Sequence, residues 1–382
     1  MALNMAPDII GTRKDAGAID GPAGQEADGV LALLTDEQVM LQDMARDLGR
    51  KLGLANPADL EGADPGACWQ ELARAGLLGF RIRDESGRPA ASGVEVAVVS
   101  EAMGAALVPV AYVVSGVLVP ELLAAAAAPA SLQADVAEGR TIIGLAMRAD
   151  LTGVATSDDL SDAVLIGTPG YRTVLALATG SGEVISVAVD DQNLERLDSI
   201  ELSLPLYRWR DTEGLTPASV GSSPSPEAMD RWLALGLSAL SAEMAGAAEA
   251  GLRGAIEYSK TREAFGVPIG TFQALQHMAA DAYVACEGLR STNNYASWSV
   301  DEEPAPDALL AGRVVKAYAG RQMVSAAETV MQMYGGIGNT WEHIAHFYAR
   351  RVLLNRYLLG DTRLQLAAIA DRRLERLSPS AS

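Results

Sequence analysis

Apolar residues recur at helical spacing in the first part of the chain. Thr35 begins a capping-box pattern with Gln38, and an apolar stripe then runs as far as Leu52. Similar segments follow up to Gly139, so residues 34–139 are predicted to form a helical domain. The helices predicted in this domain are 34–52, 68–80, 92–110 and 111–127.

After Gly139 the pattern changes to short runs of β-branched residues separated by glycine, aspartate and serine. Such runs are typical of strands, and they predict a small middle β domain over residues 140–216. The segment 217–228, rich in serine and proline, is predicted to be a linker. The predicted strands are 141–149, 163–169, 172–179 and 183–191.

Long helical segments return at Met229, and residues 229–378 are predicted to form a C-terminal helical bundle. The predicted segments are 229–260, 271–299, 305–335, 339–357 and 361–377. The order of elements therefore predicts an α+β multidomain fold, with an N-terminal helical domain, a small middle β domain and a C-terminal four-helix-bundle domain. Residues 1–33 have no period and are predicted to be a disordered tail.

The composition allows a large interior and opposes anionic partners. Of 382 residues, 49% are hydrophobic, and the net charge of −19 disfavours nucleic acid and anionic membrane surfaces. The most apolar region, 105–130, is interrupted by prolines, and the N-terminus has no signal-peptide core. Two cysteines offer no disulfide framework, so a reducing, cytoplasmic location is expected.

The three histidines do not predict a metal site. His343 and His346 lie three residues apart on a predicted helix, but neither His277 nor any other residue is an apparent third ligand. We therefore expect no metal, and a surface position for the histidine pair.

Two motifs in the bundle carry more chemistry than a helix connection needs. The segment SKTREAFGVPIG (259–270) places Arg262 and Phe265 three residues apart, where a turn requires only glycine or proline. The segment QMYGGIGNTWEHIAHFYARR (332–351) combines a glutamine, a glycine pair and a Thr-Trp-Glu-His run. Judged by spacing alone, Arg262 also fits a solvated helix-end charge, and the glycine pair a simple turn.

Together with the domain order, these motifs resemble the signatures of the acyl-CoA dehydrogenase family, over residues 34–375 apart from the β domain. The resemblance implies a dimer or tetramer in which FAD lies at the subunit interface and the neighbouring subunit holds its pyrophosphate and adenine. A guanidinium such as that of Arg262 suits the phosphate oxygens. The cofactor-binding residues implied by position are Arg262, Phe265, Gln273, Gln332, Gly335, Gly336 and Thr362.

The reaction implied by the resemblance is the α,β-dehydrogenation of an acyl-CoA thioester. In it a carboxylate removes the α proton while flavin N5 accepts the β hydride, so the carboxylate must be desolvated enough to act as a base near neutral pH. The implied partners are an acyl-CoA substrate and an electron-transfer flavoprotein or another electron acceptor.

The position of the catalytic base departs from the family pattern. Most members have a glutamate in a Glu-Gly-Thr turn, where this chain has Gly360, with Asp361 one residue away. A minority have it 26 residues before the arginine of the first motif, which here is Gly236. Glu243 lies two turns further on the same helical face and is the candidate base. Alternatively, Glu243 faces solvent or pairs with an arginine of a neighbouring helix, and Glu249 is a weaker candidate because it points off that face.

The β domain departs from the family as well. A Thr-Glu-Pro loop followed by Gly-Ser-Asp usually bonds the flavin ring, but here Met147, Arg148 and Ala149 stand in its place and the loop is nearly absent. The chain thus looks depleted in groups for its own flavin and intact in groups for a neighbour's. This suggests one half of a heteromer, as in family members that act on bulky CoA thioesters such as steroid side chains and work as heterotetramers.

Several functions remain open at this point. The chain is either an FAD-dependent dehydrogenase subunit with Glu243 at a shared site, or a catalytically silent partner that completes the FAD site of a related chain. A self-associating homo-oligomer, a different flavin chemistry such as an oxidase or hydroxylase, and a non-enzymatic helical scaffold are the further alternatives.

Overall fold

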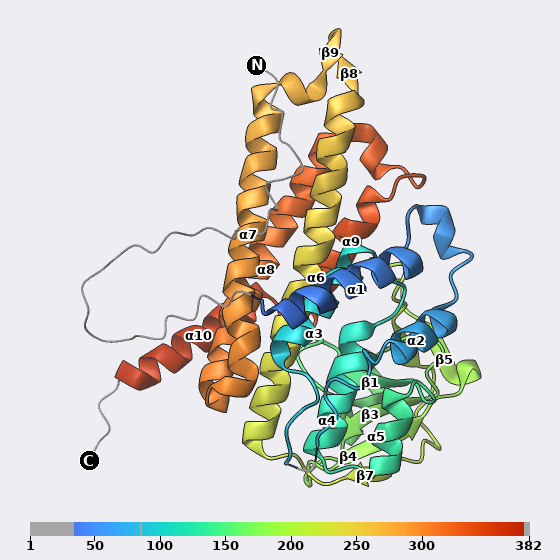
Figure 1. The fold of residues 1–382 in the computed structure, drawn as a ribbon. Helices are drawn as coiled ribbons and strands as arrows, with labels where there is room; N and C mark the ends of the chain where they lie inside the picture. Colours follow the sequence, from blue (N-terminus) through green and yellow to red (C-terminus); the bar gives the residue numbers. More distant parts are fainter. Residues whose placement is uncertain (1–33, 85, 378–382) are drawn as a thin grey trace.

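The computed structural model describes residues 34–84 and 86–377 and confirms the predicted fold class. Short helices of the N-terminal part and a β sheet lie against one side of a bundle of long helices (Figure 1). The predicted disordered tail, residues 1–33, lies outside the described residues.

The N-terminal part begins with the predicted capping box. Thr35 Oγ1 accepts a hydrogen bond from the backbone N–H of Gln38 at 3.2 Å, and Gln38 Oε1 accepts one from the backbone N–H of Thr35 at 3.0 Å. The predicted helix 111–127 is divided into a π-helical stretch and a short α-helix, since Pro120 has no N–H to donate to a preceding turn. The helices are α1 (Asp36–Leu52), the 3₁₀ turn Pro57–Leu60, α2 (Pro65–Arg74), α3 (Gly93–Ala105), the π-helical Tyr112–Leu118, α4 (Val119–Ala125) and α5 (Ala130–Ala137).

The middle domain is a seven-stranded sheet with the order β5-β6-β2-β1-β3-β4-β7, in which β1 and β3 pair in parallel and the other neighbours are antiparallel. The predicted linker 217–228 is wrong in its first part, because β7 pairs there with β4 and extends the sheet beyond residue 216. The strands are β1 (Ile143–Met147), β2 (Val164–Ile166), β3 (Thr173–Leu177), β4 (Val184–Ala188), β5 (Leu194–Arg196), β6 (Tyr207–Trp209) and β7 (Ala218–Gly221).

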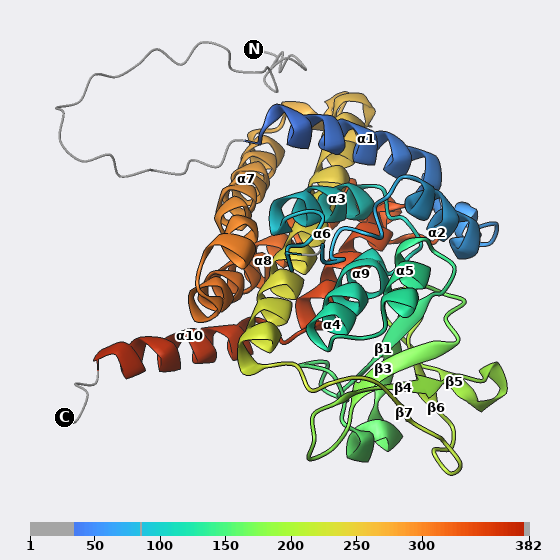
Figure 2. The same ribbon diagram turned by 60° about the horizontal axis from the view of Figure 1, so that its bottom comes forward.

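The bundle is built on three long helices that run alongside one another (Figure 1). The hairpin β8–β9, which joins α6 to α7, lies at the end of the bundle far from the sheet, and α10 projects from the body (Figures 1 and 2). None of the described helices is long and apolar enough to cross a bilayer. The elements are α6 (Pro226–Thr261), β8 (Glu263–Ala264), β9 (Val267–Pro268), the 3₁₀ turn η6 (Ile269–Thr271), α7 (Gln273–Glu302), α8 (Ala305–Tyr334), η7 (Gly335–Asn339), α9 (Ala345–Tyr357) and α10 (Thr362–Leu377).

Glycines let α3 of the N-terminal part approach α6 of the bundle. A Cβ atom on Gly246 would lie 1.9 Å from the backbone oxygen of Glu101, and one on Gly104 would lie 2.1 Å from the backbone oxygen of Glu243. Only a residue without a side chain permits this separation, so the two glycines fix the distance between the helices.

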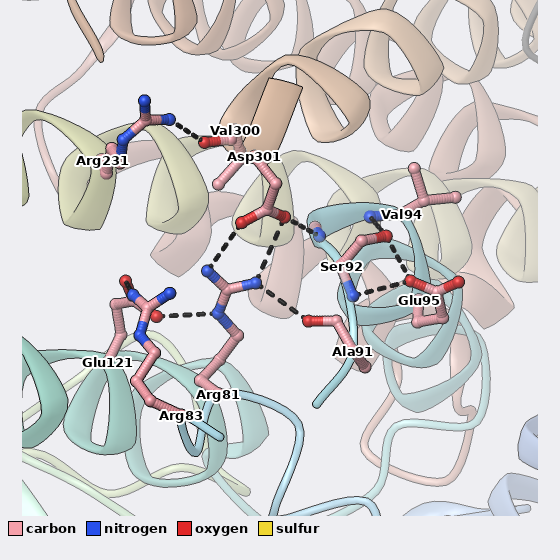
Figure 3. A network of polar contacts seen from close by, with 11 residues as sticks. Arg81, Arg83, Ala91, Ser92, Val94, Glu95, Glu121, Arg231, Val300 and Asp301 are labelled. Atoms are coloured by element: carbon pink, nitrogen blue, oxygen red, sulfur yellow. Dashed lines mark hydrogen bonds and ion pairs between the residues drawn. The ribbon is translucent and has the colours of Figure 1, made fainter. Parts of the chain in front are cut away.

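A buried charge network also joins the N-terminal part to the bundle (Figure 3). Arg81 Nε donates to Glu121 of α4 at 2.7 Å, and Arg81 Nη2 donates to Asp301 of α7 at 3.0 Å. Arg83 forms a second ion pair with Glu121, so two arginines and two carboxylates balance one another. Removing a single member would leave a buried charge without its partner, which makes the network a fixed connection between the domains.

Candidate functional site

The first motif forms an exposed projection at the far end of the bundle. Arg262 directly follows α6, and among the described residues its exposed guanidinium has no hydrogen bond or ion pair. Phe265 is 97% exposed and has a φ of 56°, a left-handed conformation that costs a bulky residue energy. A free cation and a strained, solvent-facing aromatic ring are typical of a binding site rather than of a plain turn.

The second motif lies at the same end of the bundle. α8 ends at Tyr334, and Gly335 follows with a φ of 64°, so the chain turns sharply into η7. The rings of Tyr258 and Tyr334 are 5.1 Å apart, and this contact holds the end of α8 against the end of α6. The two motifs are therefore neighbours in space although about 70 residues separate them along the chain.

A cavity of about 410 Å³ opens beside the second motif. Exposed Gln332 contributes to its wall, and a Cβ atom on Gly335 or Gly336 would meet no atom within 4 Å, so a ligand can approach the backbone there. We call this cavity, together with the projection that carries Arg262 and Phe265, the cradle. The cavity is lined by Val324, Ala327, Glu328, Met331, Gln332, Gly335, Asn339, Ala349 and Leu353.

The structure brings six of the seven predicted cofactor-binding residues to this end of the bundle and separates Thr362 from them. Gln273 begins α7 directly after the projection and is exposed. Thr362 begins α10, and its buried Oγ1 packs at Gly320 of α8, where a Cβ atom would lie only 2.5 Å away. Gly320 precedes Gln332 by 12 residues on α8, or about 18 Å along the helix.

Glu243, the candidate base, is held in a buried ion pair. It is only 4% exposed, and Arg351 of α9 donates to Glu243 Oε1 through Nη1 at 2.6 Å. The same guanidinium donates to Ser203 Oγ at 2.7 Å and lies 3.7 Å from the buried carboxylate of Glu201. Burial opposes the charge of Arg351, but Glu201 and Glu243 outweigh it and raise its pKa. This geometry favours the alternative that Glu243 pairs with an arginine of a neighbouring helix, and its catalytic role stays a prediction.

Leucine side chains and backbone fill the place where the resemblance locates the chain's own base. A Cβ atom on Gly236 would lie 2.5 Å from Leu359 Cδ1 and 2.9 Å from Leu118 Cδ2. The backbone N–H of Leu359 donates to the backbone oxygen of Leu151 at 2.8 Å. Leu151 follows β1, in the segment where the sequence predicts a shortened flavin loop, so this segment and the turn after α9 are hydrogen-bonded directly to one another. The residues present leave no room for a side chain at Gly236, so they do not fit a catalytic base there.

The segment after Leu359 is also fixed without a free carboxylate. Asp361 Oδ1 accepts a hydrogen bond from the backbone of Leu364 at 3.0 Å and so caps α10. The buried ammonium of Lys316 donates to the backbone oxygens of Asn355, Arg356 and Gly360 at 2.8, 2.9 and 3.2 Å. Burial lowers the pKa of Lys316 to about 7.

Neighbouring arginines and histidines that look alike in the sequence differ in position. Arg351 is buried whereas Arg350 is half-exposed, although a pair of arginines in sequence indicates a solvated helix face. His346 is buried, so the expected surface position is wrong for this residue. Among the described residues, no group of three or more histidine, cysteine, aspartate or glutamate side chains is placed to hold a metal ion.

Comparison with known proteins identifies the family. The N-terminal domain model of acyl-CoA dehydrogenases matches residues 35–131, and the C-terminal domain model matches residues 228–374. Acyl-CoA dehydrogenase IpdE2 of Mycobacterium tuberculosis is 31% identical over 347 residues, which cover 89% of this chain and 96% of the relative. The chain belongs to the acyl-CoA dehydrogenase family, which is FAD-dependent.

Solved structures with the same fold include heteromeric members. The ChsE4-ChsE5 complex from Mycobacterium tuberculosis has a TM-score of 0.74 at 23% identity and covers 91% of this chain and 99% of its own. A variant of the Tcur3481-Tcur3483 steroid acyl-CoA dehydrogenase has a TM-score of 0.73 at 23% identity, with 90% and 99% covered. At these identities the likeness establishes the fold alone.

Proposed function

We propose that this chain is the FAD-gripping partner subunit of a heteromeric acyl-CoA dehydrogenase, and that it carries out no dehydrogenation at its own flavin-ring position. The observation that most directly supports this proposal is the contrast between the two ends of the bundle. The cradle is open and exposed, whereas Leu118 and Leu359 crowd Gly236, the position of the implied base, and the backbones of Leu151 and Leu359 are hydrogen-bonded to one another, which we take to close the chain's own flavin-ring position. When FAD is bound, it supplies the hydride acceptor of the reaction.

The distance between the two ends supports a cofactor held by another chain. Gly236 lies on α6 and Arg262 directly follows its last residue, and their separation of 26 positions corresponds to about 39 Å. The cradle projects away from the sheet of its own chain (Figure 1). A dinucleotide gripped by Arg262 and Phe265 therefore belongs to a neighbouring subunit, whose own loop and base surround the flavin ring.

That neighbour is a related chain rather than a second copy. Two copies would offer two cradles but no flavin-ring position, because each copy has the same contact between Leu151 and Leu359. The heteromeric structures with this fold support such a pairing.

The substrate and the electron acceptor are also part of the proposal. The substrate is an acyl-CoA thioester bound by the related chain, and the description of one relative as a steroid acyl-CoA dehydrogenase supports a bulky, steroid-like acyl group. The electrons pass to an electron-transfer flavoprotein or a similar acceptor, and the implied location is the cytoplasm. The alternative that Glu243 is the base at a shared site would require it to leave the buried ion pair with Arg351.

Flavin stoichiometry tests the proposal. The chain is purified alone and together with a co-expressed related subunit, and FAD is measured by absorbance near 450 nm. We expect no bound FAD in the chain alone and one FAD per two chains in the complex. Stoichiometric FAD and acyl-CoA turnover in the chain alone would refute the proposal.

A substitution of Arg262, compared with a control substitution, tests whether this residue binds FAD. Arg262→Gln removes a cation that forms charge-assisted hydrogen bonds to phosphate, so the Kd of the complex for FAD should rise about 10-fold or more. Arg46→Gln changes another exposed arginine, on α1, and is the matched control, with no expected change. Equal FAD affinity in both variants would exclude Arg262 from the site.

A further inference from the structure

A compact exposed surface beside the cradle has no role in the proposed cofactor site. Trp341 is 66% exposed, and Ile337 and Ile200 are 45% and 48% exposed. Arg350 lies with its guanidinium carbon 5.3 Å from the Trp341 ring centre and donates to the backbone oxygen of Ile200 at 2.7 Å. We call these four residues the Trp341 patch.

The Trp341 patch is rigid before any partner arrives. Arg350 Nε donates to His346 Nδ1 at 3.0 Å, and the His346 ring meets the Trp341 ring edge-on at 5.4 Å. His346 is buried, so it supports the exposed Trp341 and the half-exposed Arg350 from below. The side chains therefore lose little rotamer freedom on binding, which favours affinity.

The composition of the patch fits a protein surface. Tryptophan and arginine are over-represented among residues that dominate binding energy at protein interfaces, and isoleucines around them exclude water. The stacked guanidinium already covers one region of the Trp341 ring, so a large apolar contact surface is left rather than a slot for a small flat ligand.

The patch is continuous with the cradle. Gly335 and Asn339 of η7 line the cavity, and Ile337, between them in the same 3₁₀ turn, belongs to the patch. Ala349 of α9 lines the cavity, and Arg350 follows it directly. If a neighbouring chain binds its dinucleotide in the cavity, the protein surface of that chain consequently contacts Trp341.

We propose that the Trp341 patch is the docking surface for the FAD-holding partner chain, and that this contact holds the two chains together with or without FAD. The inference rests on the proposed function. A second copy of this chain is the less favoured occupant, since its own flavin-ring position is filled and it would leave the adjoining cradle empty.

Binding measurements on the two separately purified chains, with and without FAD, test the inference. Trp341→Ala should raise the Kd between the chains about 30-fold or more in both conditions, as expected for an interface hot spot, while leaving Tm unchanged. Trp341→Phe should recover part of the affinity. Phe265→Ala should raise the Kd only when FAD is bound, because Phe265 belongs to the cofactor grip.

Tyr295→Ala is the matched control. Tyr295 is an aromatic residue of α7, is 50% exposed and lies near the other end of the bundle, so its removal should not change the Kd. If Trp341→Ala binds as tightly as the unchanged chain, the docking surface is refuted while one FAD per two chains still supports the proposed function. If the chain alone forms a dimer that Trp341→Ala dissociates, a second copy is the occupant and the partner assignment is overturned.

Discussion

Replacing Arg351 tests whether Glu243 is a structural or a catalytic residue. Arg351→Met leaves the carboxylates of Glu201 and Glu243 buried without a cation. Loss of one member of a buried pair costs about 3–5 kcal/mol, since the remaining charge cannot recover its hydration. Glu243→Gln should cost less, because an amide oxygen still accepts from Arg351 and Glu201 still balances its charge.

The expected change in Tm follows from the size of the protein. At about 2.1 cal/mol/K per residue, the described residues gain about 0.7 kcal/mol/K on unfolding, so a loss of about 4 kcal/mol lowers Tm by about 6 °C. Thermal denaturation of Arg351→Met, Glu243→Gln and the double variant measures this. The double variant should be more stable than Arg351→Met alone, since one uncompensated carboxylate has been removed.

Two results would refute this reasoning. One is a Tm of Arg351→Met within about 1 °C of the unchanged chain, which would mean that the ion pair contributes little. The other is a Glu243→Gln complex with normal Tm and a turnover reduced about 100-fold or more, which would restore Glu243 as a general base. We expect unchanged turnover.

Three further predictions concern stability. Gly246→Ala should destabilise the fold by about 3 kcal/mol in thermal denaturation, because its Cβ would lie 1.9 Å from the backbone oxygen of Glu101. Gly251→Ala on the same helix is the control: its Cβ would meet side-chain atoms no closer than 3.4 Å, so stability should change by less than about 1 kcal/mol. Lys316→Met should cost about 2–4 kcal/mol in the same assay, since the backbone oxygens of Asn355 and Arg356 lose the lysine donor and that of Gly360 keeps only Gln365, and an unchanged Tm would contradict this. Burial is the first cause that lowers the pKa of His346, so the unfolded chain binds more protons than the folded chain in the acid range. The free energy of unfolding should therefore be at its full value above the ordinary pKa of about 6.5 and should fall below that pH. Denaturation series between about pH 5 and 7 should show a flatter pH dependence for His346→Gln.

The sequence predicts those features of the fold that local patterns encode. The capping box at Thr35, the helices of the bundle and the four central strands all follow from periodicity over a few residues. β7 is missed because an edge strand of alanine, serine, valine and glycine has the composition of a linker, and its pairing with β4 depends on residues about 35 positions earlier.

The candidate site also combines features that local sequence predicts with features that depend on distant residues. The motifs around Arg262 and Gly335 are contiguous in sequence, and the structure joins them through Tyr258 and Tyr334. The contact of Leu151 with Leu359 spans 208 residues and has no local pattern, so the sequence indicates a shortened loop but not what fills the space. The burial of Arg351 cannot be predicted from the sequence either, because its neighbour Arg350 has the same charge but is half-exposed.

The unbroken length of α6 has a consequence for how such a chain can change. Its 36 residues keep Gly236 and the cradle about 39 Å apart, and substitutions at that separation act independently on free energy. After a gene duplication, substitutions around Gly236 can therefore accumulate one at a time, while the affinity of the cradle for the dinucleotide of a related chain stays unchanged.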